Sequence, residues 1–457
     1  MLKQLLAMTF CLLFTTGLAH LHADPLIKAE TFTLKNGLRF FLMQNKRAPI
    51  VCYSTWFNVG SADELPGKTG LAHYLEHLME TGLPEVQMGQ FLEDFQSSGS
   101  HSNAITTRDH TFYYKVMMTD HLELLMRYEA GRMRGMAFNQ AKFDTEKNVI
   151  LEERLMRIET NPDEFFDEKF NNTFFSVHPY KNPVIGWEKD IRALTLEDAK
   201  AFHHKWYRPS NAFVVVSGDF DPAQVKVWAQ KYYGDLPAGE KPERKRPLEP
   251  LQKAKIAPVV VEHPKVSQLG MIEAYSLAGL KKSNYRDVLA LVFLSEYLEG
   301  DFKGSLYDVL VHQKKLASSF GSYCPFFSER DPWNFTFYVR PTSAEKWAEI
   351  KTIIHQKLEE IAQKGLKEED LKRARRYAYN EMVMSLDDIH QKAVLLGEAL
   401  SSDITLEQLN ALPEDLEKLT SADIQRVIRT YLLHERAVEG VLQKPQSASL
   451  SKKEGMK

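Results

Sequence analysis

The stretch LTLED at residues 194–198 returns in altered form as LTSAD at residues 419–423. Each copy opens a segment of helical periodicity, which ends at Tyr207 in the first copy and at Tyr431 in the second. A short apolar run typical of a β-strand follows each segment. The separation of the two copies is far longer than a solenoid repeat, so it predicts two copies of one domain.

The region between the copies reads as a linker. Residues 236–255 are rich in Pro, Lys, Arg and Glu and have no hydrophobic periodicity. The basic run at 241–246 within them is expected to be solvated. We therefore predict a first domain at 24–235, a second domain at 256–445 and a polar tail at 446–457.

The first half mixes both hydrophobic periods. Residues 38–42, 50–59 and 111–117 are apolar or alternating and rich in β-branched and aromatic side chains, which predicts strands. Residues 120–136 and 196–207 repeat at helical spacing. The strands and helices do not alternate one for one, which favours an α+β fold over a doubly wound parallel sheet.

Composition excludes several classes of protein. The chain has 457 residues, of which 44% are hydrophobic and 26% charged, so it is neither a disordered chain nor a small disulfide-stapled domain. Its 58 Lys and Arg nearly balance its 61 Asp and Glu, for a net charge of -3. This balance gives no reason to expect nucleic acid or an anionic membrane as a partner.

The amino terminus resembles a secretory signal. Lys3 precedes a largely apolar run at residues 5–18, and small residues lead to a cleavage position after Ala23. We predict a signal peptide at 1–23 and a mature chain without a membrane anchor. Cys52 and Cys324 remain after cleavage, and their pairing stays open, although two buried thiols are the preferred interpretation.

The pentapeptide HYLEH at residues 73–77 contains candidate metal ligands and a candidate general base. Residues four apart share one face of a helix, so the imidazoles of His73 and His77 can bind one metal ion. Glu76 is three residues after His73 and shares that face. Two imidazoles and one carboxylate suit zinc, with Glu76 beside the ion as a general base.

A third ligand is available in the segment EKNVILEE at residues 146–153. Glu146 and Glu153 are two helical turns apart and share one face, with Val149 and Ile150 turned toward the interior. Glu152 points about 100° away from that face. Either glutamate of the shared face is a candidate ligand on these grounds.

These motifs are similar to those of the pitrilysin/insulinase family of zinc peptidases, which includes the mitochondrial processing peptidase and bacterial relatives. The resemblance implies that His73, His77 and Glu153 bind one zinc ion per chain. It also implies that Glu76 is the catalytic base and that Glu146 orients the site.

Further segments resemble the same family. Asn103 and Ala104 match its substrate-side edge strand, which implies that a peptide binds there as an added strand. The family fold is two homologous α+β domains, each a mostly antiparallel sheet with helices on one face. The resemblance therefore implies that residues 24–235 form the catalytic domain and residues 256–445 a homologous non-catalytic one.

One departure from the family concerns the second half. Members that work alone carry an Arg and a Tyr seven residues apart in that half, which hold the substrate and polarise its carbonyl. Val311 and Ser318 stand in those places here. Val311 has no donor and Ser318 is too short to reach, which suggests that a homologous partner chain supplies the Arg and Tyr.

The resulting prediction is an exported zinc metalloendopeptidase that hydrolyses peptides or unfolded polypeptides by Glu-assisted attack of zinc-bound water. It would act as the zinc-bearing subunit of a heterodimer in the periplasm, with secretion from the cell as second choice. The alternative is a non-catalytic structural or peptide-binding member of the same family.

Overall fold

The computed structural model describes residues 25–79, 99–135, 138–250, 256–278, 280, 284–325, 329–331, 334–433 and 437–445. The predicted signal peptide at 1–23 and the polar tail at 446–457 lie outside them. Within the described residues, no helix is long and apolar enough to cross a membrane.

The first half contains a six-stranded sheet in the order β1-β2-β6-β3-β5-β4, antiparallel except where β2 runs parallel to β6. Its predicted strands and helices are confirmed. The strands are β1 (Glu30–Thr33), β2 (Arg39–Gln44), β3 (Ile50–Phe57), β4 (His101–Thr106), β5 (Thr111–Met118) and β6 (Ala212–Gly218). The helices are α1 (Leu71–Met79), α3 (Leu122–Arg134), α4 (Gln140–Arg154), α5 (Pro162–Phe174), α6 (Glu188–Ala193), α7 (Leu196–Trp206) and α8 (Pro222–Tyr233).

The second half repeats this design. Its five-stranded sheet has the order β7-β11-β8-β10-β9, with β7 parallel to β11 and the other pairs antiparallel. This is the same topology as β2-β6-β3-β5-β4, so the α+β fold with two related sheets is confirmed. The strands are β7 (Val259–Glu262), β8 (Gly270–Ser276), β9 (Ala317–Tyr323), β10 (Asn334–Pro341) and β11 (Val438–Gln443). The helices are α9 (Tyr285–Glu299), α10 (Trp347–Lys364), α11 (Glu368–Ser385), α12 (Ile389–Ser401), α13 (Leu406–Lys418) and α14 (Ser421–Val427).

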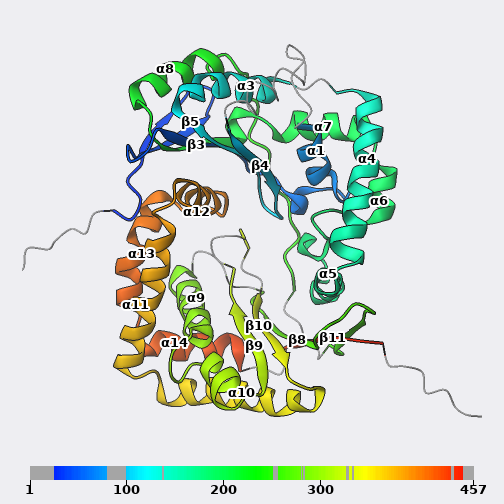
Figure 1. Ribbon diagram of the computed structural model, residues 1–457, viewed down its shortest axis with the longest axis vertical. Helices are drawn as coiled ribbons and strands as arrows, with labels where there is room; N and C mark the ends of the chain where they lie inside the picture. Colours follow the sequence, from blue (N-terminus) through cyan, green and yellow to red (C-terminus); the bar gives the residue numbers. More distant parts are fainter. Residues whose placement is uncertain are drawn as a thin grey trace, which may run out of the picture.

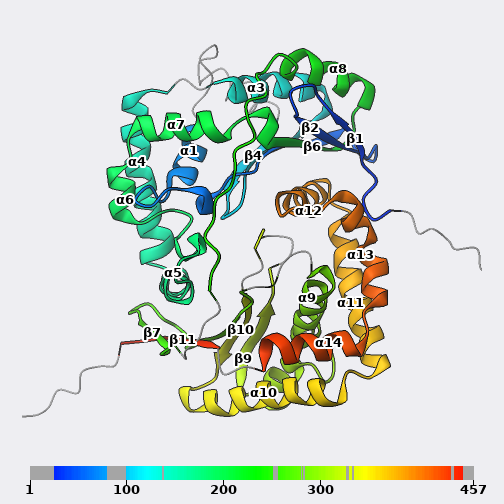
Figure 2. The same cartoon turned by 180° about the vertical axis from the view of Figure 1, so that it is seen from behind.

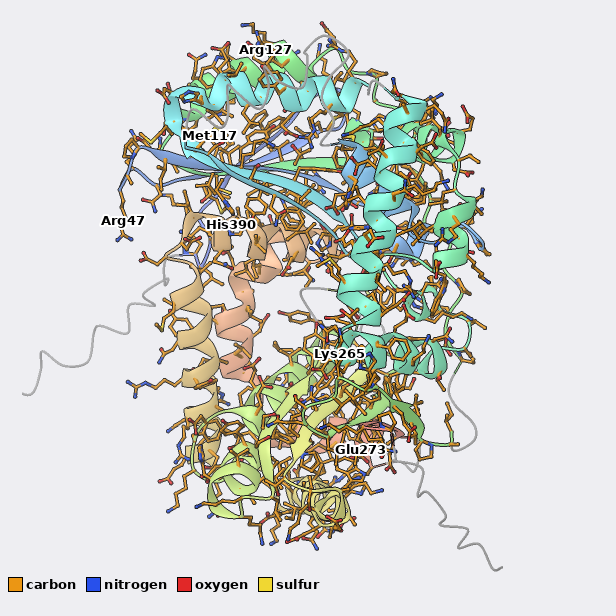
Figure 3. All side chains as sticks on the ribbon, turned by 45° about the vertical axis from the view of Figure 1, so that its right-hand side comes forward. Arg47, Met117, Arg127, Lys265, Glu273 and His390 are labelled. Atoms are coloured by element: carbon orange, nitrogen blue, oxygen red, sulfur yellow. The ribbon has the colours of Figure 1, made fainter. Side chains whose placement is uncertain are left out.

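Each half lends one helix to the other half's sheet. In Figure 1, α12 lies on the opposite side of the first sheet from α3 and α8. A Cβ added at Gly397 of α12 would lie 2.1 Å from the Trp56 ring of β3, so the contact needs glycine. His390, at the start of α12, packs on Tyr114 of β5 with ring centroids 4.2 Å apart (Figure 3).

The reciprocal contact is made by α5, whose Phe166 and Phe170 lie against Gly440 of β11. The two rings share one apolar cluster with Ile272 and Ala274 of β8. The other face of that sheet is covered by its own helices, including α9 and α10. The two sheets are therefore covered on both faces, each by its own helices and by one helix of the other half. The apolar area buried in these contacts holds the halves together.

The linker is not the solvated segment that its composition suggested. Its described part, residues 236–250, runs from the first half toward the second and is seen in the rear view of Figure 2. The side chain of Arg246 is only 6% exposed, and it pairs with Asp63 at 3.0 Å, with Asp109, and with Asp331 at 3.4 Å. The interpretation of the basic run as solvated is wrong for Arg244 and Arg246, because the buried Asp63 carboxylate binds both guanidinium groups.

We predict that Arg246→Met lowers the free energy of unfolding by about 3–5 kcal/mol, because it leaves buried carboxylates unpaired. Burial raises the pKa of Asp109, but the charge of Arg246 outweighs burial and holds that pKa well below its ordinary value. The stabilisation is therefore present above pH of about 4 and is lost as the pH falls through the lowered pKa.

Urea unfolding at pH 7 and at lower pH measures this effect. Lys245→Met is the matched control, because the Lys245 side chain is 79% exposed and should change stability by less than about 0.5 kcal/mol. Equal effects of the two substitutions would contradict the assignment.

Candidate active site

Helix α1 presents the HYLEH motif on a firmly held segment. It starts after Gly70, whose φ of 86° is a left-handed conformation that glycine adopts freely. The Glu64 carboxylate accepts hydrogen bonds from the backbone N–H groups of Gly70 at 2.9 Å and Ala72 at 2.7 Å. These bonds satisfy donors that the first turn of a helix leaves unpaired.

Tyr74, inside the motif, joins α1 to α4. Its ring stacks on Phe143 with centroids 4.5 Å apart, and its hydroxyl donates a hydrogen bond to the Phe143 carbonyl. Both side chains are fully buried. The contact fixes α4 beside the face of α1 that carries the histidines.

Helix α4 places its three glutamates as the spacing predicted, but one of its apolar residues lies elsewhere than predicted. Glu146 and Glu153 turn toward the histidines, and Glu152 is exposed. Ile150 is buried, but Val149 is 45% exposed, so the interpretation of Val149 as an interior residue is wrong. The face that α4 buries is narrower than its sequence suggested.

His73, His77 and Glu153 converge on one point. Glu153 Oε2 lies 3.6 Å from His73 Nε2 and 3.3 Å from His77 Nε2. One ligand atom from each residue lies within 4.8 Å of the others. Ligand atoms about 2.1 Å from a tetrahedral zinc ion are about 3.4 Å apart, so the Glu153 distances fit such an ion.

The surrounding charges support a cation at this point. Glu146 Oε2 lies 3.3 Å from His77 Nδ1, and Glu146 Oε1 binds the Lys142 ammonium at 3.1 Å. Arg157 binds Glu153 Oε1 at 2.9 Å, while the other carboxylate oxygen of Glu153, Oε2, faces the histidines. A carboxylate behind a ligand histidine fixes its ring orientation and raises its basicity.

The pKa values of the two histidines shift in opposite directions. Burial, together with a smaller contribution from His77, lowers the pKa of His73 to about 4. Burial also lowers the pKa of His77, but Glu153 and Glu146 outweigh it and raise that pKa above its ordinary value. The negative potential of the glutamates therefore favours positive charge at the shared point, and neutral His73 is in the form that binds metal.

Glu76 lies next to the cluster and is held by the edge strand of the sheet. The Thr106 hydroxyl of β4 donates a 2.5 Å hydrogen bond to Glu76 Oε2. Thr106 in turn lies 3.5 Å from the Thr111 hydroxyl of β5, which donates to the Val59 carbonyl. The sequence analysis missed Thr106, although it stands only two residues after Ala104.

Asn103 and Ala104 lie on β4, an edge strand whose only partner among the described strands is β5. The Asn103 side-chain oxygen accepts a 3.0 Å hydrogen bond from the Ala104 N–H. The Ala104 N–H is therefore directed to the Asn103 side chain and not to β5. An edge of this kind can add a further strand.

Arg154 is a second residue that the sequence analysis missed. It follows Glu153 directly, is 6% exposed, and binds Glu168 of α5 at 2.8 Å and the Gly186 carbonyl at 2.9 Å. Gly186 packs against Gly70 at the start of α1 so closely that a Cβ would lie 2.5 Å from the Gly70 Cα. Arg154 thus ties the end of α4 to the start of α1, and a lone Arg in a charged segment gives no sequence signal of this role.

Comparison with known proteins identifies the chain. Residues 39–188 match the family described as insulinase (peptidase family M16), and residues 193–377 match the family described as the peptidase M16 inactive domain. The chain belongs to peptidase family M16. The predicted pitrilysin/insulinase resemblance is confirmed.

Relatives of this M16 chain include zinc proteases. Zinc protease PqqE of Helicobacter pylori is 33% identical over 321 residues, which cover 69% of this chain and 71% of PqqE. A protease of H. pylori with a solved structure has a TM-score of 0.81 at 27% identity and covers 92% of this chain and 100% of its own. The periplasmic protease PqqL of Escherichia coli shares the fold, with a TM-score of 0.75 at 18% identity over 91% of this chain and 47% of PqqL.

In the second half of this M16 chain, Val311 and Ser318 stand where other family members carry Arg and Tyr, and neither side chain offers a hydrogen-bond donor to a substrate. Val311 lies in the short helix at Asp308–Gln313, partly buried against the core. Ser318, on β9, donates a 3.2 Å hydrogen bond to the Arg340 carbonyl. Elsewhere, Cys52 and Cys324 are buried free thiols, which confirms the preferred interpretation.

We predict a graded loss of zinc from substitutions on α4. Glu153→Gln removes a ligand and should abolish stoichiometric binding, whereas Glu146→Gln should weaken binding by roughly 10- to 100-fold. Glu152→Gln is the matched control on the exposed face and should bind zinc as the unsubstituted chain does. Metal analysis and competition with a chelator measure the series, and zinc loss in the Glu152 variant equal to that in the Glu153 variant would contradict the ligand assignment.

A second prediction concerns Thr106. Thr106→Val should lower kcat about tenfold, because a hydrogen bond to a charged group contributes about 1.5 kcal/mol to holding Glu76. KM and zinc content should stay unchanged, and Thr106→Ser should restore kcat. A fall in zinc content or a rise in KM without a change in kcat would assign Thr106 a different role.

Proposed function

We propose that this M16 chain is a zinc endopeptidase that hydrolyses peptides or unfolded polypeptides. The observation that carries the proposal is the convergence of His73, His77 and Glu153 on one point. Glu76 lies beside this point, on the helix α1 that also carries the two histidines. This arrangement combines a three-ligand zinc site with a carboxylate base.

His73, His77 and Glu153 would hold the ion, and Glu146 would orient His77 from behind. Zinc in such a site supplies Lewis acidity, which polarises a carbonyl group and acidifies a water molecule. Glu76 takes a proton from the attacking water as the oxygen adds to the scissile carbonyl carbon. It then gives that proton to the departing amine as the C–N bond breaks, so its carboxylate is regenerated.

Thr106 orients the catalytic base, and the edge of β4 orients the peptide. The Thr106 hydroxyl fixes one carboxylate oxygen of Glu76, which limits the rotation of the base. A peptide added to β4 at Asn103 and Ala104 would lie in register with Thr106 and hence near Glu76. Because strand addition uses main-chain hydrogen bonds, it tolerates many sequences and requires an extended, unfolded substrate.

We further propose that the chain works as the zinc-bearing subunit of a heterodimer. Hydrolysis creates negative charge on the carbonyl oxygen, and hydrogen-bond donors placed there stabilise it strongly. Val311 has no donor, and the Ser318 hydroxyl is engaged with a backbone carbonyl. A homologous partner chain that carries the Arg and Tyr would supply the missing donors.

Export to the periplasm is the proposed location. Lys3, the apolar run at 5–18 and the small residues before Asp24 support a cleaved signal peptide. The related fold of PqqL belongs to a periplasmic protease. A periplasmic location also suits a peptidase that acts on unfolded chains, because it keeps the enzyme away from the unfolded proteins of the cytoplasm.

Cleavage of a quenched fluorescent, unstructured peptide tests the proposal. We expect slow turnover by the purified chain, which Glu76→Gln lowers at least about a hundredfold while zinc stays bound. Addition of a homologous subunit that carries the Arg and Tyr should raise kcat. Zinc binding without any turnover, alone or with that subunit, would favour a peptide-binding protein, and full activity of the isolated chain would contradict the heterodimer.

A further inference from the structure

A cavity of about 690 Å³ lies where the two halves and the linker meet. Its walls come from β1 and β2 of the first sheet, from the connection between α12 and α13, and from linker residues 241–244 (Figure 2). Strand β1 forms the opposite edge of the first sheet from β4, where the peptide is proposed to bind. The cavity is therefore separate from the candidate active site, and its volume is typical of a site for a small molecule.

Arg39 of β2 presents a firmly positioned guanidinium group to this cavity. Its Cζ atom lies 5.7 Å from the centroid of the Phe41 ring and 5.6 Å from that of the Phe213 ring. These cation–π contacts hold the group in place but use none of its N–H donors. Among the described residues, Arg39 has no hydrogen-bond partner, so its donors are left for a ligand.

The carboxylates of the cavity do not serve as partners for Arg39. Asp403 binds Arg330 at 2.5 Å, and Glu243 binds Lys245 at 3.2 Å. The remaining carboxylate, that of Glu407, is exposed to water, which screens its charge.

The cavity therefore carries unpaired positive charge. Of its basic residues, Arg330 is bound to Asp403, and Arg244 pairs with Asp63 at 3.6 Å. Arg39 and Lys241 line the same cavity, and neither forms an ion pair with any residue that the structure describes. Two unpaired cations beside one cavity favour an anion as its ligand.

A buried hydroxyl group also points to a ligand. Ser210 lines the cavity, and its side-chain oxygen is buried without a hydrogen-bond partner in the described part of the chain. Buried polar atoms are nearly always paired in native proteins, and a hydroxyl can donate to an anion. Phe32, Leu400 and Ile404 line the cavity as well, so apolar surface adjoins the donors. This combination fits an organic anion better than an inorganic one.

We propose that the cavity binds a small organic anion, which is a carboxylate or a phosphate ester with an apolar body. The planar fork of Arg39 matches two oxygens of either group, and Lys241 adds charge. Ser210 donates a further hydrogen bond. Because the walls belong to both halves and to the linker, the bound anion would hold these parts together. The proposal does not depend on the peptidase function, since the two sites lie at opposite edges of the first sheet.

Fluorescence titration of the zinc-loaded chain tests the proposal with three compounds that share one ring system: 1-naphthyl phosphate, 1-naphthoate and 1-naphthol. We expect at least one of the two anions to bind about tenfold more tightly than the uncharged naphthol, as charge-assisted hydrogen bonds require. The anion that binds more tightly identifies the head group. A zinc-free preparation should bind it equally well, because the cavity shares no residue with the candidate zinc site.

Arg39→Gln should weaken binding of the anion by about tenfold and leave naphthol unaffected, whereas Ser210→Ala should weaken it by roughly fivefold. Arg127→Gln is the matched control and should change nothing. Arg127 is likewise an exposed arginine over an aromatic ring, 5.6 Å from the centroid of Tyr128, but it lies on the other side of the first sheet from α12 (Figure 3). Equal or absent binding of the three compounds, an equal loss in both Arg variants, or loss of anion binding on removal of zinc would overturn the proposal.

Discussion

The contact between Tyr74 and Phe143 is the constraint on which the candidate zinc site depends. The histidines come from α1 and the third ligand from α4, so their meeting requires these helices to keep one fixed offset. Stacking of the two rings, with the Tyr74 hydroxyl on the Phe143 carbonyl, sets that offset at one end of α4. Arg154 sets it at the other end. A shift of about 1 Å between ligands is enough to spoil a metal site, so both anchors are needed.

The exchange of helices between the halves extends this rigidity to the whole molecule. Helix α5, which Arg154 binds through Glu168, also covers the second sheet, and α12 returns the contact to the first. Arg246 of the linker adds charge pairing, because it binds Asp63 of the first half and Asp331 of the second. The second half therefore supports the half that carries the candidate zinc site.

The sequence predicted the repeat, the strands and helices of the first half, and the face that carries His73, His77 and Glu153, because these follow from periodicity and local spacing. It misjudged Arg246 and Val149, because burial of a charge or exposure of an apolar side chain depends on what packs against it. It missed Thr106 and Arg154 for the same reason. Their roles arise from partners distant in sequence, such as Glu76 and Gly186, which no local pattern records.

X-ray absorption at the zinc K edge of the purified, zinc-loaded chain tests the central claim most directly. The account predicts one zinc per chain in a four-coordinate site, with two imidazole nitrogens and oxygen donors at about 2.0–2.2 Å. The imidazole contribution should disappear in a His73→Ala, His77→Ala double variant. A six-coordinate spectrum without imidazole scattering, or a spectrum that the double substitution leaves unchanged, would place the zinc elsewhere and contradict the account.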